Sequence, residues 1–119
     1  MKESEWNRLW KALADPTRRQ VLDLLAEGPL TTGQLAEAFP NLTRFAVMKH
    51  LGLLHEANLL SIRREGRQRF NYLNPVPLRA LYERWLIRFT EPAAANLLAL
   101  KRHVEADADP KSHTPSKED

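Results

Sequence analysis

The 119-residue sequence contains no cysteine, which removes several kinds of chemistry at once. Without cysteine there is no disulfide, no thiolate metal ligand and no cysteine nucleophile, which is typical of a reducing compartment. No run approaches the roughly 20 apolar residues of a membrane span. The charged first residues, MKESEWNRLW, lack the apolar stretch of a secretory signal. We therefore expect a cytoplasmic protein with no membrane partner.

Motifs of catalysis are also missing. The sequence has no phosphate-binding glycine loop and no Gly-x-Ser-x-Gly nucleophile elbow, and its His, Asp and Glu residues do not have metal-ligand or acid–base spacing. His50 is expected to face inward with a hydrogen bond, and His55 to lie at the surface. His103 has only Asp107 at i+4, and His113 falls in the presumed tail. We expect no enzyme, no cofactor and no metal site.

The excess positive charge is concentrated in one part of the chain. The sequence has 18 Lys and Arg residues against 15 Asp and Glu, a net charge of only +3. Between Asn41 and Pro75, however, six cations accompany two acids, so this segment carries +4 and the rest of the chain −1. A basic segment on a nearly neutral scaffold is typical of a protein that meets a polyanion with one face. The cations are Arg44, Lys49, Arg63, Arg64, Arg67 and Arg69.

The first forty residues have the spacing of three short helices. Asp15 followed by Pro16 is a cap and first-turn pair, and it begins the second helix. Thr31 and Gln34 have capping-box spacing and begin the third helix, which ends at Pro40. The first helix is predicted from an apolar stripe formed by Trp6, Leu9, Trp10 and Leu13.

A fourth helix, predicted from Thr43 to Ala57, has two contrasting faces. A solvated helix rarely displays Phe and Met beside two cations unless something covers them, because contiguous exposed apolar area marks contact sites. The outer face therefore indicates a binding surface. The inner face carries Val47, His50, Leu51 and Leu54, and the outer face carries Arg44, Phe45, Met48, Lys49 and Gly52.

The remainder of the chain is predicted to contain a hairpin and one long helix. Strands over Leu59 to Arg64 and Arg67 to Leu73 are joined by a turn at Glu65-Gly66. Pro92 interrupts the helix, after which a weaker apolar stripe continues to Glu105. We expect one domain over residues 1–105 and a disordered tail over 106–119. The long helix is indicated by Leu78, Leu81, Tyr82, Trp85 and Phe89.

This order of elements, α-α-α-α-β-β-α, predicts a mainly α fold with a small β-hairpin, the winged helix-turn-helix. The stretches LADPTRRQVLDLLAEGPLTTGQLAEAF, TRFAVMKHLGLLHEANLL and IRREGRQRFNYLNP resemble the ArsR family of bacterial transcriptional repressors, over roughly Trp6 to Phe89. The resemblance implies a homodimer that places the helix from Thr43 to Ala57 in the major groove, with the hairpin as the wing. It also implies a signal that releases the DNA.

The sequence departs from the metal-sensing members of that family, as it reads QLAEAF where their thiol motif lies. The turn from Phe39 to Leu42 looks one residue longer than usual, and Gly52 replaces an often cationic position. The missing thiol motif predicts a non-metal-binding type, and the changed turn alters the angle of the fourth helix. The operator, the regulated genes and the inducing signal are not indicated.

The chemistry of the basic segment supports DNA as the partner. Arg44 and Lys49 can donate to guanine O6 and N7, and Phe45 and Met48 can contact thymine methyl groups. In the wing, Arg64 and Arg67 lie closest to the tip. Thr31 and Thr32 either bind a phosphate or cap their helix. The predicted DNA-binding set is Thr32, Thr43, Arg44, Phe45, Met48, Lys49, Arg63, Arg64, Arg67 and Arg69.

Two alternatives stay open at this stage. Phe45 and Met48 also suit a subunit contact, or a winged helix that binds a protein without reading DNA sequence. Aromatic stripes on the terminal helices are often ordinary core, although three tryptophans are hard to hide in one small domain. Together with the resemblance they predict a homodimer interface at Trp6, Leu9, Trp10, Leu81, Trp85 and Phe89. We thus expect a sequence-specific regulator of double-stranded DNA, a repressor released by an unidentified signal.

Overall fold

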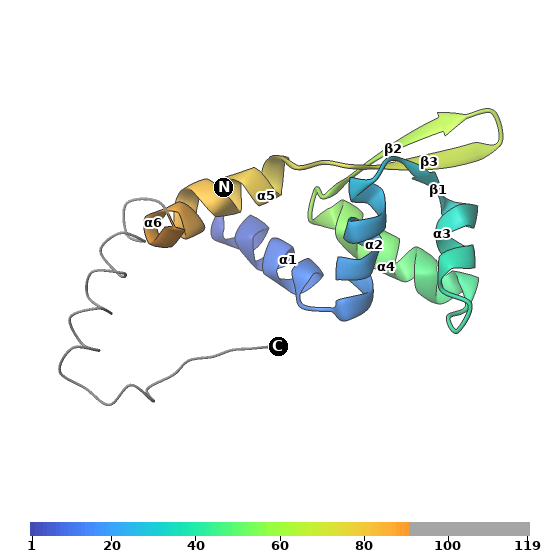
Figure 1. The fold of residues 1–119 in the computed structure, drawn as a ribbon, viewed down its shortest axis with the longest axis horizontal. Helices are drawn as coiled ribbons and strands as arrows, with labels where there is room; N and C mark the ends of the chain where they lie inside the picture. The colour runs from blue at the N-terminus through green and yellow to red at the C-terminus, as the bar shows by residue number, and fades with distance from the viewer. Residues whose placement is uncertain (91–119) are drawn as a thin grey trace, which may run out of the picture. The chain divides into compact units, whose positions relative to one another are not determined.

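The computed structural model describes residues 1–90, and Figure 1 gives its course. The chain divides into a first unit, residues 1–79, and a second that begins at Ala80. The interpretations placed beyond Thr90, namely the interruption at Pro92, the domain end at Glu105 and the tail over 106–119, lie outside the described residues.

The first two helices are joined by hydrogen bonds from a buried arginine. Helix α1 spans Glu3–Leu13 and α2 spans Pro16–Ala26. As predicted, the side chain of Asp15 caps α2 by accepting from the backbone N–H of Arg18 at 3.1 Å. Arg18 then donates through Nε to the carbonyl of Ala12 and through Nη2 to that of Lys11, each at 2.9 Å. A cation therefore donates to two carbonyl groups in the last turn of α1, where helix carbonyls lack intrahelical partners. The carbonyl of Lys11 also accepts from the backbone N–H of Ala14 at 3.3 Å.

The next two helices begin with the caps that the sequence predicts. Helix α3 (Thr32–Ala38) begins with a capping box in which Thr31 and Gln34 bond reciprocally, at 2.9 and 3.0 Å. Helix α4 (Arg44–Glu56) begins where the Thr43 hydroxyl accepts from the N–H of Ala46 at 3.0 Å. These interactions join residues three positions apart, so local sequence is sufficient to specify them.

The sheet has three antiparallel strands in the order β1-β3-β2, one more than the sequence predicted. Strands β2 (Leu60–Glu65) and β3 (Gln68–Leu73) form the hairpin, and β1 (Leu30–Thr31) pairs with β3. The turn lies one residue later than predicted: Glu65 pairs with Gln68, so the turn is Gly66-Arg67. Gly66 has a φ of +64°, which a glycine adopts without strain.

A buried asparagine, which the sequence analysis did not identify, joins the sheet to α3. The amide nitrogen of Asn71 on β3 donates to the carbonyl of Leu30 and to the hydroxyl of Thr32, both at 3.2 Å. A buried amide requires such partners, because an unpaired polar group in the interior costs about 1–3 kcal/mol. Asn71 therefore fixes the beginning of α3 against the hairpin.

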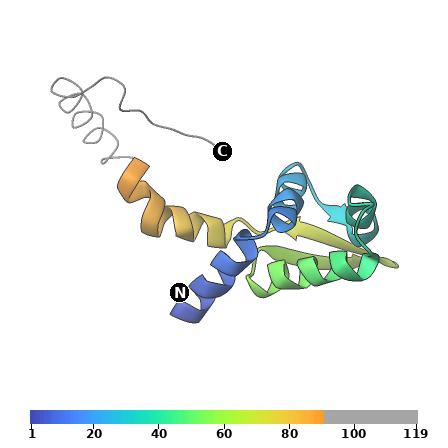
Figure 2. The ribbon, with the colours of Figure 1, turned by 90° about the horizontal axis from the view of Figure 1, so that it is seen from below.

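The core of the first unit lies between the helices and the sheet. Helix α4 runs alongside the hairpin (Figures 1 and 2) and turns its predicted inner face, Val47, Leu51 and Leu54, into the core. Leu9 of α1 is fully buried. Its assignment to a subunit interface does not fit this position, because the core already covers the side chain. The other fully buried large side chains are Val21, Leu35, Leu59 and Asn71.

The helix predicted after the hairpin is interrupted in its hydrogen bonding. Helix α5 spans Val76–Leu81, a π-helical turn η1 spans Tyr82–Leu86, and α6 spans Ile87–Thr90. Within the second unit, the rings of Trp85 and Phe89 pack edge to face with centroids 5.6 Å apart. Through residue 90, no helix is both long and apolar enough to cross a membrane.

Candidate nucleic-acid interface

The outer face of α4 carries large apolar side chains exposed to solvent, as the sequence predicts. Phe45 is 73% exposed and Met48 38% exposed, and the cations Arg44 and Lys49 are exposed beside them. Thr43, also exposed, has its hydroxyl committed to the helix cap. This face therefore combines hydrogen-bond donors with apolar groups, the two kinds of partner that base edges in the major groove require.

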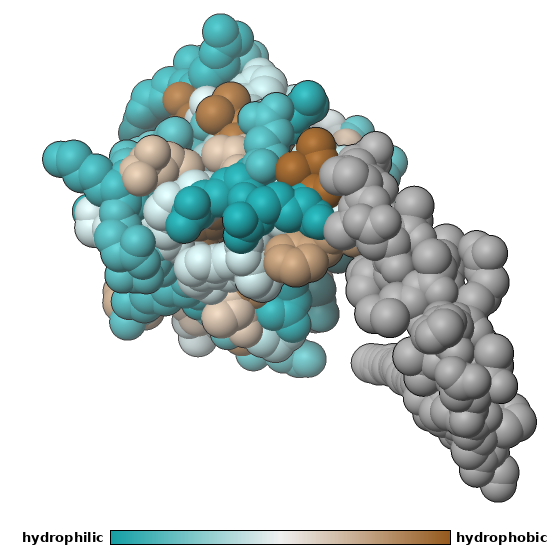
Figure 3. All heavy atoms as spheres, turned by 90° about the vertical axis from the view of Figure 1, so that its left-hand side faces the viewer, coloured by the Kyte–Doolittle hydropathy of each residue, from teal (hydrophilic) through white to brown (hydrophobic). Residues whose placement is uncertain are grey.

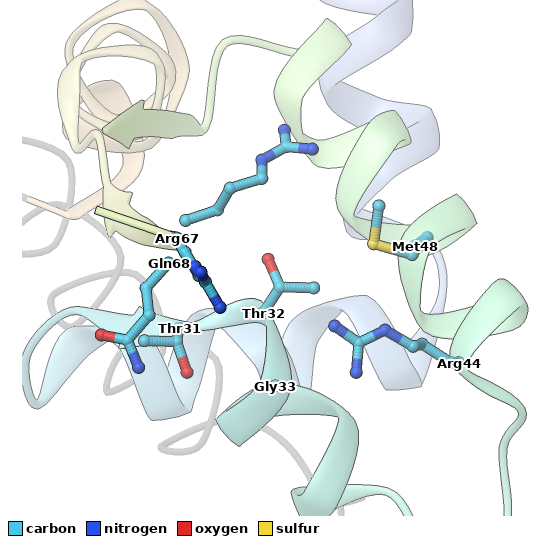
Figure 4. A pocket seen from close by; sticks show the side chains of 8 residues that line it. Thr31, Thr32, Gly33, Arg44, Met48, Arg67 and Gln68 are labelled. Atoms are coloured by element: carbon cyan, nitrogen blue, oxygen red, sulfur yellow. The ribbon is translucent and has the colours of Figure 1, made fainter. Parts of the chain in front are cut away.

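A hollow of about 310 Å³ brings this face together with the hairpin and α3. In Figure 4 the side chain of Arg44 extends from α4 toward Thr32 and Gly33, while Arg67 and Gln68 come from the hairpin. Arg44 thus lines the same concavity as Arg67 and Arg69, which are distant from it in sequence, and the two hairpin arginines there suit a phosphate group. The lining residues are Thr31, Thr32, Gly33, Arg44, Met48, Arg67, Gln68 and Arg69.

The four hairpin arginines fall into separate positions. Arg64 and Arg69 are direct partners across the β2–β3 ladder, so their side chains leave the same face of the sheet. Arg63 pairs with Phe70 on the opposite face, and its guanidinium lies 5.8 Å from the centroid of the Tyr72 ring. Arg67 occupies the turn. Strand alternation therefore separates Arg63 from the arginines near the hollow.

The two threonines before and at the start of α3 are both buried, and both have structural duties. The hydroxyl of Thr31 belongs to the capping box, and that of Thr32 accepts from Asn71. Thr32 nevertheless lines the hollow. A hydroxyl that accepts one hydrogen bond still carries a proton to donate, so a phosphate contact from Thr32 is compatible with its bond to Asn71.

Sequence analysis did not identify Arg18 as a buried residue. Its side chain is only 8% exposed, although a basic residue of this kind is expected at the surface. Its Nη1 lies 3.2 Å from Nδ1 of His50 on α4, and Oδ2 of Asp15 lies 3.9 Å from the same nitrogen. Burial raises the pKa of Asp15, but the hydrogen bond from the Arg18 amide and the charges of Arg18 and His50 outweigh it and lower that pKa below its ordinary value. His50 thus has the predicted hydrogen bond, in a half-buried position.

The histidines do not gather with acids at a metal site in the part of the chain that the structure describes. No group of three or more His, Asp or Glu side chains there is arranged to hold an ion. His55 is exposed near the end of α4, as predicted. His103, Asp107 and His113 lie outside the described residues, so the absence of a metal site stays a prediction.

This chain is similar to known proteins in both sequence and fold. A family model described as a helix-turn-helix domain matches residues 13–63. The transcriptional repressor SdpR of Bacillus subtilis is 37% identical over 83 residues, which cover 70% of this chain and 90% of SdpR. The HTH-type transcriptional regulator Rv2034 of Mycobacterium tuberculosis is 45% identical over 75 residues, covering 63% of this chain and 69% of the relative. A crystal structure of the ArsR family transcriptional regulator RHA00566 is 36% identical, covers 73% of this chain and 93% of its own, and superposes with a TM-score of 0.66.

The helices, the three-stranded sheet and the basic hairpin define a winged helix-turn-helix transcriptional regulator, a class that binds DNA. Within that class the chain belongs to the ArsR family. Its mainly α fold with a small sheet confirms the fold predicted from the sequence, with β1 as the addition. The family assignment confirms DNA as the kind of partner, and it leaves open which residues make the contacts.

Proposed function

We propose that the protein is a sequence-specific repressor that binds double-stranded DNA as a homodimer and is released by a signal. The observation that carries this proposal is the meeting of Arg44, Arg67 and Arg69 at one hollow beside the exposed Phe45. A duplex can offer phosphate to that hollow and base edges to the helix face at the same time. The relative SdpR is named a transcriptional repressor, which supports the direction of regulation.

In this proposal the side chains of α4 contact bases and those of the hairpin contact phosphates. Arg44 and Lys49 donate to base edges, and Phe45 and Met48 contact thymine methyl groups. The hairpin contacts phosphates through Arg67 at the turn and through the facing pair Arg64 and Arg69, with help from Thr32 and the helix cap residue Thr43. Arg63 belongs to the interface only at its edge, because it leaves the opposite face of the sheet.

Exposed aromatic residues support the homodimer. Trp10 on α1 and Trp85 on η1 are each 45% exposed, and Phe89 on α6 is 50% exposed. Trp6 and Leu81 are half-buried. The face drawn in Figure 3 carries separate hydrophobic spots among hydrophilic residues, and protein interfaces commonly mix the two in this way. We assign the dimer contact to Trp6, Trp10, Leu81, Trp85 and Phe89, and omit the buried Leu9.

Selection from a random-sequence duplex library tests the proposal directly. The full chain should enrich duplexes with two related half-sites, roughly one helical turn or a multiple apart, because a two-fold dimer presents two α4 helices. Footprinting on the DNA around its own coding sequence then locates an operator. Enrichment of no sequence, with random DNA bound as tightly as any selected duplex, would contradict sequence-specific binding.

The exposure of Phe45, at 73%, favours a second candidate function. A winged helix can meet a protein partner through the same outer face of α4. The basic surroundings count against it, because the cores of protein interfaces are depleted in charge. If the chain binds no duplex at low salt, but Phe45→Ala abolishes binding to a protein partner, this second function replaces the first.

A further inference from the structure

Arg18 of α2 connects this helix to α1 and to α4 through three hydrogen bonds. Its Nε and Nη2 reach the carbonyl groups of Ala12 and Lys11 at the end of α1, and its Nη1 reaches His50 on α4. A guanidinium has its donors in a fixed planar fork, so these contacts are geometrically linked. The position of His50, and with it that of the proposed base-reading helix, is therefore tied to the end of α1.

The contact with Arg18 also determines the chemical state of the imidazole. A guanidinium only donates hydrogen bonds and is never deprotonated in proteins. Nδ1 of His50, 3.2 Å away, must therefore accept, and the proton of the neutral ring must lie on Nε2. A protonated ring has N–H groups at both nitrogens, so it cannot accept from Arg18. The connection exists only while His50 is neutral.

Asp15 offers a second partner to the same nitrogen. Its Oδ2 lies 3.9 Å from Nδ1 of His50, too far for a hydrogen bond but close enough for a protonated ring to turn toward it. Oδ2 already accepts from the amide of Arg18 at the beginning of α2. Protonation therefore exchanges an Arg18-to-His50 bond for a His50-to-Asp15 bond and leaves Nη1 of Arg18 without this acceptor.

The other surroundings of His50 contain few competing charges. From α1, the groups joined to it through Arg18 are backbone carbonyls of Lys11 and Ala12. Among the described residues, we find no ion pair from α3 or β2 to His50. On α4 itself, the positions that share its side of the helix are uncharged: Ala46, Val47, Leu53 and Leu54. Arg18 and Asp15 are thus the charged groups that decide its partner.

We propose that Arg18 and His50 are positioning residues for DNA binding, and that protonation of His50 weakens binding by detaching α4 from Arg18. This inference rests on the proposed DNA-binding function. Its direction is distinctive, because added positive charge at low pH ordinarily strengthens binding to a polyanion. Histidine is the side chain whose ordinary titration falls between about pH 5 and pH 8.

The test compares the full chain with His50→Gln on a library-selected duplex at about pH 8 and about pH 5.5, at fixed salt. Glutamine can accept from Arg18 through its amide oxygen but does not titrate. The wild-type chain should lose roughly ten-fold more affinity on acidification than His50→Gln loses, because a hydrogen bond to a charged group is at stake. His55→Gln, which removes an exposed histidine of the same helix, should retain the wild-type loss.

A second variant tests Arg18 itself. Arg18→Lys keeps the charge but not the planar fork, so a folded Arg18→Lys protein should bind the selected duplex more weakly and with a flatter pH profile than wild type. If Arg18→Lys does not fold, as judged by circular dichroism, the His50→Gln comparison alone decides. Equal pH profiles of wild type and His50→Gln would overturn the inference. Failure of the wild type to prefer the selected duplex over random DNA at about pH 8 would contradict the proposed function instead.

Discussion

Arg64 and Arg69 lie directly opposite each other on β2 and β3, so two positive side chains share one face of the hairpin. Like charges in this position destabilise a sheet by a few tenths of a kcal/mol or more unless an anion lies between them. Arg69 also lines the hollow that Arg67 and Arg44 share. The arrangement costs stability in the free protein, and the proposed phosphate contact would offset that cost.

The hairpin should supply affinity that depends on salt rather than on sequence. We expect Arg67→Ala to weaken selected and random duplexes alike, and to reduce the slope of log affinity against log salt by about one per subunit. Arg63→Ala is the matched control from the same hairpin, and it should change the slope less because Arg63 stands over Tyr72. Fluorescence anisotropy over a salt series measures both slopes. Equal effects from the two variants would contradict the division of the hairpin into two faces.

The beginning of α4 should read sequence. Arg44→Ala is expected to weaken the selected duplex by about 1–3 kcal/mol, the range of a bidentate base contact, and to relax the preference at one base pair of each half-site. Competition with single-base variants of the selected duplex measures that preference. If Arg44→Ala instead weakens all duplexes equally, Arg44 is a phosphate contact, and base reading falls to Lys49, Phe45 and Met48.

The aromatic residues of the terminal helices should hold two copies together. We expect the wild-type chain to sediment as a dimer at micromolar concentration, and Trp10→Ala combined with Trp85→Ala to shift it toward monomer, because exposed aromatics contribute much of an interface's binding energy. Leu9→Ala is the contrasting variant. It should lower the free energy of unfolding by about 2–5 kcal/mol, because it opens a cavity in the core. A double tryptophan variant that remains fully dimeric would exclude this interface.

Asp15 should make stability depend on acid pH. Its pKa is lowered in the folded state, so its carboxylate contributes stability at neutral pH, and this contribution is lost as the pH falls below about 4. Asp15→Asn keeps a side chain that can cap α2 but does not titrate. Asp15→Ala also loses the cap, which lowers the free energy of unfolding by about 1 kcal/mol. Urea unfolding at about pH 7 and about pH 3 should show the difference between wild type and Asp15→Asn shrinking in acid. An equal difference at both pH values would contradict the role assigned to the carboxylate.

Features that depend on neighbours along the chain could be predicted from the amino-acid sequence alone. The caps at Asp15, Thr31 and Thr43 join residues three positions apart, and the two faces of α4 follow from helical periodicity. Both signals are local, so no knowledge of the fold was needed to read them. The same periodicity indicated that Phe45 is exposed and that Val47 is buried.

Contacts between residues far apart in the sequence could not be predicted in this way, because they depend on how the elements pack. Strand β1 has two residues, too few for any alternation to reveal, and it exists because β3 supplies its hydrogen bonds. Arg18 and Asn71 are polar and look like surface residues, yet partners 32 and 39 positions away, His50 and Thr32, allow them to be buried. Periodicity placed Leu9 on a helix stripe but did not say what covers the stripe, because burial depends on the elements that pack against it.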